Sequence, residues 1–247
     1  MRSCLLSLLI TIALLVVVLW LTLPMLAGYA ILGMLNIGGF NGRDTQVEVQ
    51  ANPPLIILTG HADTVHLVSN DVSVNELRAR RIDLQLDDVA VLSRHVGAVH
   101  GTLEGVDVMG AATAGRSDAT VRVSVQEVRV EGPAFMAGAT VVMTGAEAAR
   151  LAASQLKIAS GMTATVSFKT PDAVTIKSGG QTQIGHLVVK EGALLLVPDG
   201  GKMPTVVLMK PGKGNPFIFT AARVGTDLTG VQIVTLEGTI DIQSLLD

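Results

Sequence analysis

Histidines are the side chains here with the widest chemical range, and four of the five form two pairs, His61 with His66 and His95 with His100. A helical zinc site needs i, i+4 spacing, which neither pair has. On a straight strand, partners five residues apart would lie on opposite faces. The sequence has no H-E-x-x-H motif and no pair of cysteines, so we expect no metal site.

Other short motifs also lack the context that catalysis requires. Ser117 in GRSDA (115–119) is outside a G-x-S-x-G elbow, and GGKMP and PGKGNP have no Ser or Thr after the lysine, as a phosphate-binding loop requires. Asp87 and Asp88 are adjacent, so on an extended chain their carboxylates point to opposite sides, which does not suit shared acid–base work. We predict a protein that is not an enzyme and uses no cofactor.

The first element along the chain is an apolar N-terminal segment. No Asp, Glu, Lys or Arg occurs between Arg2 and Arg43, and residues 4–23 are long and apolar enough to cross a bilayer as a helix. The sequence favours an uncleaved anchor over residues 1–42, with the N-terminus in the cytoplasm and residues 43–247 outside the cell membrane. A cleaved signal peptide and secretion are the alternative, although its apolar region is typically only ~7–15 residues long.

The exported part alternates apolar and polar residues with the period of β-strands, and LIILTG after Pro53–Pro54 is expected to be a short strand. In TVRVSVQEVRV (120–130) the apolar series Val121, Val123, Val125 slips by one at Gln126–Glu127. One convincing helix interrupts the strands, in TGAEAARLAASQLKIAS. Thr144 and Glu147 have the spacing of a capping box, and Gly161 ends the helix. We predict an α+β fold, mostly antiparallel β.

A single helix cannot cover so many half-apolar strands. A helix of about this length covers roughly two strands. The remaining apolar surface must close on itself as a sandwich or barrel, meet a partner, or enclose a ligand. Flexible aliphatic walls suit acyl chains, and they also suit an ordinary core. The net charge of −3 and the lack of a basic run with aromatics argue against nucleic acid as a partner.

Three stretches carry a family resemblance: VSVNELRARRIDLQLDDVAVLSRHVGAVHGTLEGVDV, VEGPAFMAGATVVMTGAEAARLAAS and GALLLVPDG. In this order they resemble the LmeA-like family of bacterial cell-envelope proteins, over roughly residues 55–245. The resemblance implies a curved sheet wrapped around one main helix and binding of phospholipid. The additional amphipathic helix of that family has no counterpart in NGRDTQVEVQANPP, and the family supplies no site residues.

The sequence therefore predicts a membrane-anchored extracytoplasmic protein that binds phospholipid or another acyl-chain lipid in an apolar groove. The alternative is a structural or protein-interaction module of the cell envelope whose β core is filled by its own side chains. The predicted lipid contacts, chosen from the apolar pattern, are Leu84, Leu86, Val121, Val123, Val125, Met143, Leu151, Leu156, Met162 and Phe168.

Overall fold

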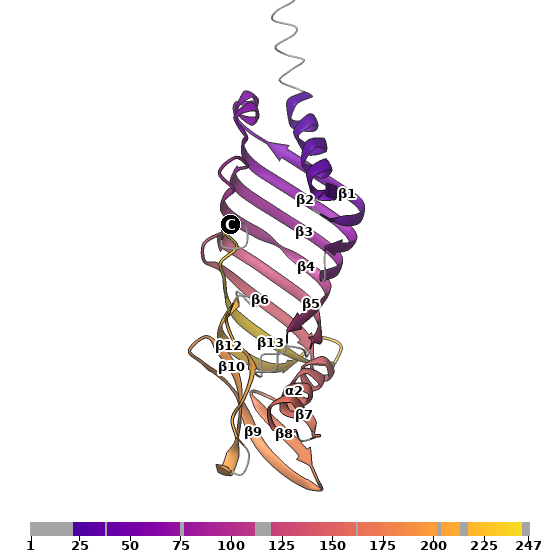
Figure 1. Cartoon of the computed structure of the whole chain (residues 1–247), viewed down its shortest axis with the longest axis vertical. Helices are drawn as coiled ribbons and strands as arrows, with labels where there is room; N and C mark the ends of the chain where they lie inside the picture. Colours follow the sequence, from indigo (N-terminus) through magenta and orange to yellow (C-terminus); the bar gives the residue numbers. More distant parts are fainter. Residues whose placement is uncertain are drawn as a thin grey trace, which may run out of the picture.

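The computed structural model of the chain describes residues 22–37, 39–74, 77–111, 120–161, 163–201, 204–212 and 217–243. Strands make up 63% of the structure, with a few helices, so the predicted mostly antiparallel β fold is confirmed. The strands form two antiparallel sheets, one of eight strands and one of five. The molecule is elongated, with the larger sheet occupying most of its length and the smaller sheet at one end (Figure 1).

The larger sheet has the order β1-β2-β3-β4-β5-β6-β13-β12, so most neighbours in space are also neighbours in sequence. Long antiparallel neighbours of this kind follow from the period-two pattern and from short connecting turns. Its strands are β1 (Asn41–Gln50), β2 (His61–Val74), β3 (Leu77–Ala90), β4 (His95–Ala111), β5 (Thr120–Pro133), β6 (Ala137–Thr144), β12 (Phe217–Thr226) and β13 (Gln232–Ile240).

The smaller sheet has the order β11-β10-β9-β8-β7 and lies beyond the β12 end of the larger one (Figure 1). Its strands and the short 3-10 helix η2 are β7 (Thr165–Lys169), β8 (Ala173–Ser178), β9 (Gln181–Lys190), β10 (Ala193–Pro198), η2 (Asp199–Gly201) and β11 (Val206–Met209).

Helix α2 (Gly145–Ser160) has the predicted ends. Thr144 adopts an extended conformation, and its side chain accepts a hydrogen bond from the Glu147 backbone N–H at 3.1 Å. Gly161 is left-handed, with φ of 71°, and donates its backbone N–H to the Lys157 carbonyl. The helix contacts β5, β6 and β13 of the larger sheet and β7 and β11 of the smaller one. It therefore packs between the two sheets at one end, whereas the resemblance implied a sheet wrapped around it.

A second helix covers residues 22–37 and lies beside β1 at the opposite end of the larger sheet (Figure 1). None of the helices among the described residues has both the length and the apolarity needed to cross a bilayer. Most of the predicted anchor, residues 4–23, lies outside the described residues, so that anchor is not shown and stays a prediction.

One local prediction from the sequence is wrong. The segment LIILTG, expected to be a strand, belongs mainly to the 3-10 helix η1 (Pro54–Thr59), which ends at the left-handed Gly60. The segment after Asn41, in which the sequence showed no amphipathic helix, forms the strand β1 at the edge of the larger sheet. Val49 of β1 and Ile57 of η1 belong to one apolar cluster, so both elements pack against the sheet.

Candidate functional site: an apolar trough along the sheet

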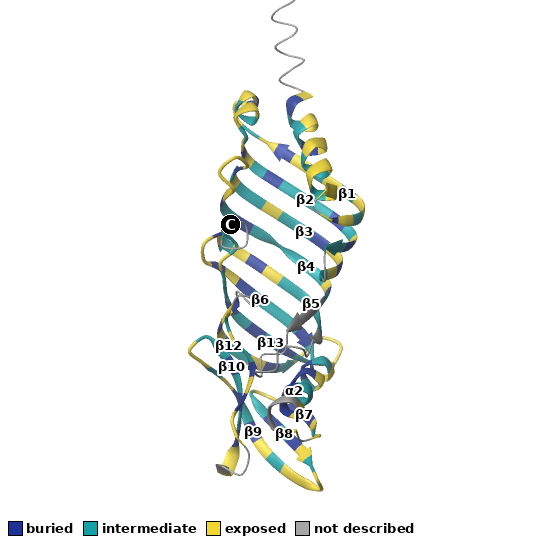
Figure 2. Cartoon of the chain, viewed as in Figure 1, coloured by how far each residue is buried: buried dark blue, intermediate teal, exposed yellow. Residues whose placement is uncertain are grey.

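The apolar side chains of the larger sheet gather on one face, here called the inner face. They line up in rows from strand to strand because antiparallel partners place their side chains on the same side. Buried and half-buried positions alternate with exposed ones along these strands (Figure 2). One row, in strand order from β1, is Val47, Leu67, Leu84, Gly101, Val130, Ala139, Gly238 and Phe219. The next row, from β2, is Ser69, Ile82, Leu103, Val128, Val141, Leu236 and Ala222.

The alternation reverses along a line that crosses four neighbouring strands. On β2 the buried inner residues Ser69 and Val72 are three positions apart instead of two, and the same holds for Ala79 and Ile82 on β3. Two consecutive residues then face outward between them. The residue pairs at the corresponding positions of β4 and β5 are Leu103 with Val106 and Val125 with Val128.

Backbone geometry marks this line as a crease. Asp71 and Gly105 both have positive φ, of 48° and 58°, and a Cβ on Gly105 would lie 3.0 Å from the Cβ of Arg80. Irregular positions of this kind bend a strand and increase its twist. The exposed residue Gln126 on β5 belongs to the same line. The phase slip seen in the sequence is therefore part of a bend that four neighbouring strands share.

A second crease crosses β2, β3 and β4 nearer their other ends. The inner residues Leu86 and Val89 lie three positions apart, with Asp87 and Asp88 between them, and Asp88 has φ of 51°. Val96 and Val99 on β4 repeat the spacing. Two creases curve the sheet around its apolar face, which makes that face the floor of a trough.

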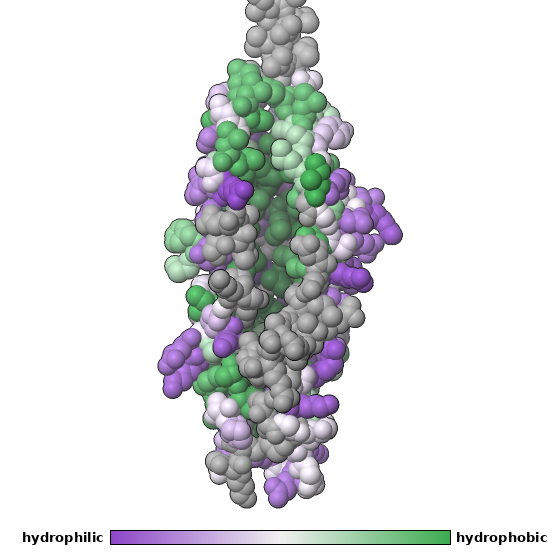
Figure 3. Space-filling model, viewed as in Figure 1, coloured by the Kyte–Doolittle hydropathy of each residue, from purple (hydrophilic) through white to green (hydrophobic). Residues whose placement is uncertain are grey.

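The trough is visible as a hollow along the long axis with a hydrophobic floor, and hydrophilic side chains lie beside part of its length (Figure 3). Among the described strands and helix α2, β3 and β4 pack extensively only against their neighbours within the sheet. Accordingly, several large aliphatic side chains of the floor are only half-buried, although they pack beside a buried cluster. These are Leu67, Leu84, Leu103, Val125 and Val128.

The two ends of the trough are closed differently. At the β1 end the helix of residues 22–37 contributes Ala27, Ile31 and Leu35 to the clusters that contain the inner residues of β1 to β4. At the β12 end helix α2 and the smaller sheet form a large sealed core with β6, β12 and β13. Counting only the described residues, the middle of the trough is therefore the part with the least cover.

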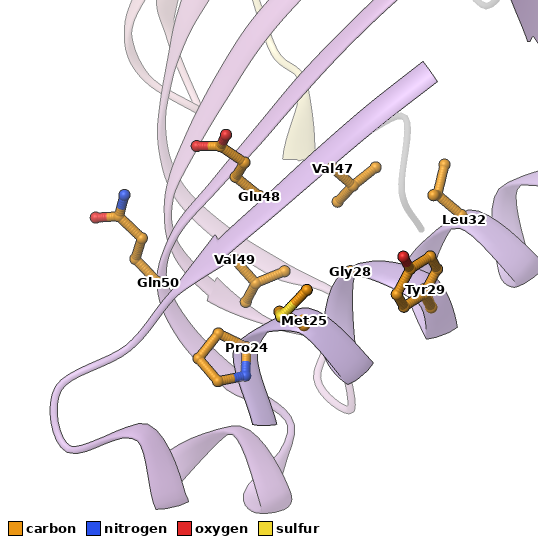
Figure 4. A pocket seen from close by; sticks show the side chains of 9 residues that line it. All are labelled: Pro24, Met25, Gly28, Tyr29, Leu32, Val47, Glu48, Val49 and Gln50. Atoms are coloured by element: carbon orange, nitrogen blue, oxygen red, sulfur yellow. The ribbon is translucent and has the colours of Figure 1, made fainter. Parts of the chain in front are cut away.

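A pocket of about 470 Å³ lies between the helix of residues 22–37 and β1. Met25 and Tyr29 from the helix and Val47 and Val49 from the strand line it (Figure 4). Gly28 permits the close approach of the two elements, since a Cβ there would lie 2.6 Å from the Val47 main-chain oxygen. The pocket is mainly apolar, and Glu48 is its one ionisable side chain besides Tyr29.

The predicted lipid contacts fall into separate places. Leu84, Leu86, Val123 and Val125 are half-buried on the sheet, and three of them, Leu84, Leu86 and Val125, pack beside the inner-face clusters. Met143, Leu156 and Phe168 are 2%, 0% and 4% exposed, within the sealed core, and Leu151 is buried on α2. Met162 and the side chain of Val121 lie outside the described residues.

Sequence reasoning missed Leu67, Leu103 and Val128, which continue the floor of the trough on β2, β4 and β5. The available signal was the spacing of three between apolar residues in neighbouring strands, which the sequence shows in GTLEGVDV as well as in SVQEVRV. Helix residue Leu35 was missed because its segment was assigned to the membrane anchor.

The outer face of the sheet carries the ionisable side chains. Nε2 of His66 lies 2.8 Å from Oδ1 of Asp83, and this hydrogen bond lowers the pKa of the Asp83 carboxyl group, with Arg81 adding to the effect. His100 lies 3.5 Å from the Asp87 carboxylate. Because a crease separates the members of each histidine pair, both members face outward, contrary to the expectation for a straight strand.

On the larger sheet these outward groups form local contacts of two or three residues, such as Asp83 with His66 and Arg81. Among the described residues no three His, Cys, Asp or Glu side chains are arranged to hold a metal ion. His186, on the smaller sheet, lies 3.3 Å from the Asp172 carboxylate and 3.5 Å from that of Asp199, with all three side chains substantially exposed. The geometry here gives surface ion pairs when the imidazole is protonated.

Comparison of the chain with models of protein families found no match, and searches among curated proteins and among solved structures found none either. The fold and the site therefore define only the architecture of the protein, an antiparallel sheet with two creases and an apolar trough. The resemblance to the LmeA-like family stays a prediction.

Proposed function

We propose that the protein binds phospholipid or another acyl-chain lipid in the trough, as a membrane-anchored extracytoplasmic protein that handles cell-envelope lipid without covalent chemistry. The observation that carries the proposal is the set of half-buried aliphatic side chains on the trough floor, Leu67, Leu84, Leu103, Val125 and Val128. An apolar surface left half in water gains free energy when acyl chains cover it.

The size of this gain supports binding without a specific headgroup site. Each CH₂ group removed from water contributes ~0.8 kcal/mol. A chain lying along a row would pass one residue per strand, most of them aliphatic, at a spacing of ~4.8 Å. Several CH₂ groups per strand pair would then be covered, which supports affinity for acyl chains in general rather than for one lipid.

The self-filled module remains the second candidate, because one half of the molecule has the interior that it requires. Leu156, Leu196 and Val174 are each 0% exposed in the core shared by α2 and the smaller sheet. Under that alternative the apolar faces would bury one another, and the protein would act through contacts at its outer surface.

Lipid recovery tests the proposal. The full chain is purified in detergent, exchanged extensively to remove loose lipid, extracted with organic solvent and analysed by mass spectrometry. We expect a stoichiometric acyl-chain lipid. Leu84→Trp and Leu103→Trp fill the floor and should lower the recovered lipid several-fold, whereas the matched outer-face change Gln85→Trp on the same strand should not.

Equal lipid recovery from all variants would remove the trough from the proposal. No lipid above the detergent background in the unaltered chain would favour the self-filled module.

A further inference from the structure

The β1 end of the trough carries an exposed apolar surface, here called the apolar tip. It consists of side chains from the helix of residues 22–37, from η1 and from the β3–β4 turn, and each is exposed at 44% or more. These residues are Met25, Leu26, Tyr29, Leu55, Leu58 and Leu92.

Direct contacts show that these segments are neighbours. Ile57 of η1 packs in the same cluster as Ala27 and Ile31 of the helix. The Val91 backbone N–H donates to the Gly60 carbonyl at 2.8 Å, and a Cβ on Gly60 would lie 3.0 Å from Leu92. Hydrophobic surface accordingly flanks this end of the hollow on both sides (Figure 3).

The segments that form the tip also lack charged side chains, and Glu48 lies beside them in the pocket against β1. Residues 22–42, 51–60 and 89–93 contain no Asp, Glu, Lys or Arg. Exposed apolar groups of this number in one place mark an interaction surface. Segments without charged side chains supply no ion pairs to a charged partner, but they can enter the hydrocarbon region of a bilayer at low free-energy cost. Tyr29, with an apolar ring and a polar hydroxyl, suits the membrane–water interface.

The position of the tip selects the bilayer from other apolar partners. Residues 4–21, which contain no charged side chain, join the chain at Thr22, directly at the tip. A segment of this composition partitions into the bilayer. It would hold the tip, and with it the β1 end of the trough, at the membrane surface.

We infer that the apolar tip inserts into the surface layer of the membrane and that this end is where acyl chains pass between the bilayer and the trough. The inference rests on the proposed function for the passage of lipid, whereas insertion of the tip stands on its own surface. The opposite end of the sheet, at the β12–β13 turn, would point away from the membrane.

Site-specific quenching in the full chain tests insertion. Cys4 is the only cysteine, so a Cys4→Ser background allows single cysteines to be labelled with a fluorophore that responds to polarity. The test positions are Leu58→Cys and Leu92→Cys. Leu228→Cys is the matched control, because Leu228 is a fully exposed leucine in the β12–β13 turn.

The labelled proteins are reconstituted in phosphatidylethanolamine–phosphatidylglycerol vesicles that contain a lipid with a nitroxide on its acyl chain. We expect a blue shift and several-fold stronger quenching at both test positions than at the control. Quenching equal to that of Leu228→Cys would overturn the inference. A blue shift that persists at the same size in lipid-free detergent and grows with protein concentration would assign the tip to a second copy of the chain and would also overturn it.

A second measurement separates insertion from lipid passage. Leu58→Asp and Leu92→Asp change exposed residues and should leave folding intact, yet slow the exchange of fluorescent phospholipid from vesicles into the protein several-fold, whereas Leu228→Asp should not. Unchanged exchange rates would exclude entry at the tip. If tip quenching is seen while the unaltered chain takes up no lipid, the proposed function fails and the membrane contact stands.

Discussion

Gly28 in the N-terminal helix lies so close to Val47 in β1 that a Cβ on Gly28 would be 2.6 Å from the Val47 main-chain oxygen. No real Cβ is found at such a distance from a backbone atom, so any larger residue must move the helix away from the strand. The helix packs on the sheet through this contact, together with Ala27 and Ile31.

Gly28→Ala should therefore destabilise the protein although alanine favours helices. We expect the free energy of unfolding to fall by about 1–3 kcal/mol, the usual cost of overpacking. Gly33→Ala is the matched control in the same helix, since nothing lies within 4 Å of its added Cβ. It should stabilise by roughly 0.5–1 kcal/mol. Denaturant unfolding of the full chain in detergent measures both, and a stabilising Gly28→Ala would contradict the described packing.

The crease through β4 gives a second prediction. Gly105 has φ of 58°, a conformation that costs other residues about 1–2 kcal/mol, and Arg80 lies across from it. Gly105→Ala should lower the free energy of unfolding by about that amount, whereas Gly225→Ala in β12, where φ is ordinary and the space is open, should change it little. Thermal unfolding of both variants provides the comparison, and equal effects would argue against a specific bend at Gly105.

Features set by local sequence could be predicted. The Thr144–Glu147 cap and Gly161 fix both ends of α2 within a single segment, and the period-two pattern identifies most strands. The slip at Gln126–Glu127 was also visible in the sequence. The sequence did not show that this slip belongs to a crease shared by several strands. That crease depends on the strand register, which brings Asp71, Arg80 and Gly105 into line.

The sequence predicted an apolar site, but it identified only some of the residues that line the trough. Leu84 and Met143 are both apolar residues of strands predicted from the sequence, yet Leu84 is half-buried on the trough floor and Met143 is sealed in the core. Which strands the small sheet and α2 cover is decided by long-range packing. The same cause turns the strand-like Leu55–Thr59 stretch into a 3-10 helix, since Pro54 begins it and Ile57 packs on the sheet.

The outer face should make stability depend on pH through Asp83. The hydrogen bond from His66 holds the Asp83 pKa below its ordinary value of 3.8. A carboxyl group whose pKa is lower in the folded protein adds stability above its unfolded pKa, and that stability is lost as the pH falls through the folded value. Asp83→Asn should thus be less stable than the unaltered chain near neutral pH, and the difference should shrink as the pH falls below about 4.

The size of this effect should be small, because both side chains of the pair are partly exposed, at 38% and 40%. Unfolding measured across this pH range with Asp71→Asn as a control separates the contribution, since Asp71 pairs with the exposed Arg43 instead. A stability difference for Asp83→Asn that grows toward acid pH would reverse the sign and contradict the assignment.

The contrast between Leu84 and Met143 separates a ligand-binding floor from a self-filled core. Met143→Ala leaves a cavity in sealed packing and should cost about 2–5 kcal/mol, whereas Leu84→Ala removes a half-buried side chain and should cost less. A bound lipid stabilises the folded protein by an amount that grows with the logarithm of the free lipid concentration divided by its Kd. If lipid binds in the trough, adding phospholipid in detergent should raise the unfolding temperature of the unaltered chain and of Met143→Ala equally. It should raise that of Leu84→Ala less, because of the two residues only Leu84 would touch the lipid. If lipid raises all three equally, the acyl chains lie elsewhere than on the trough floor.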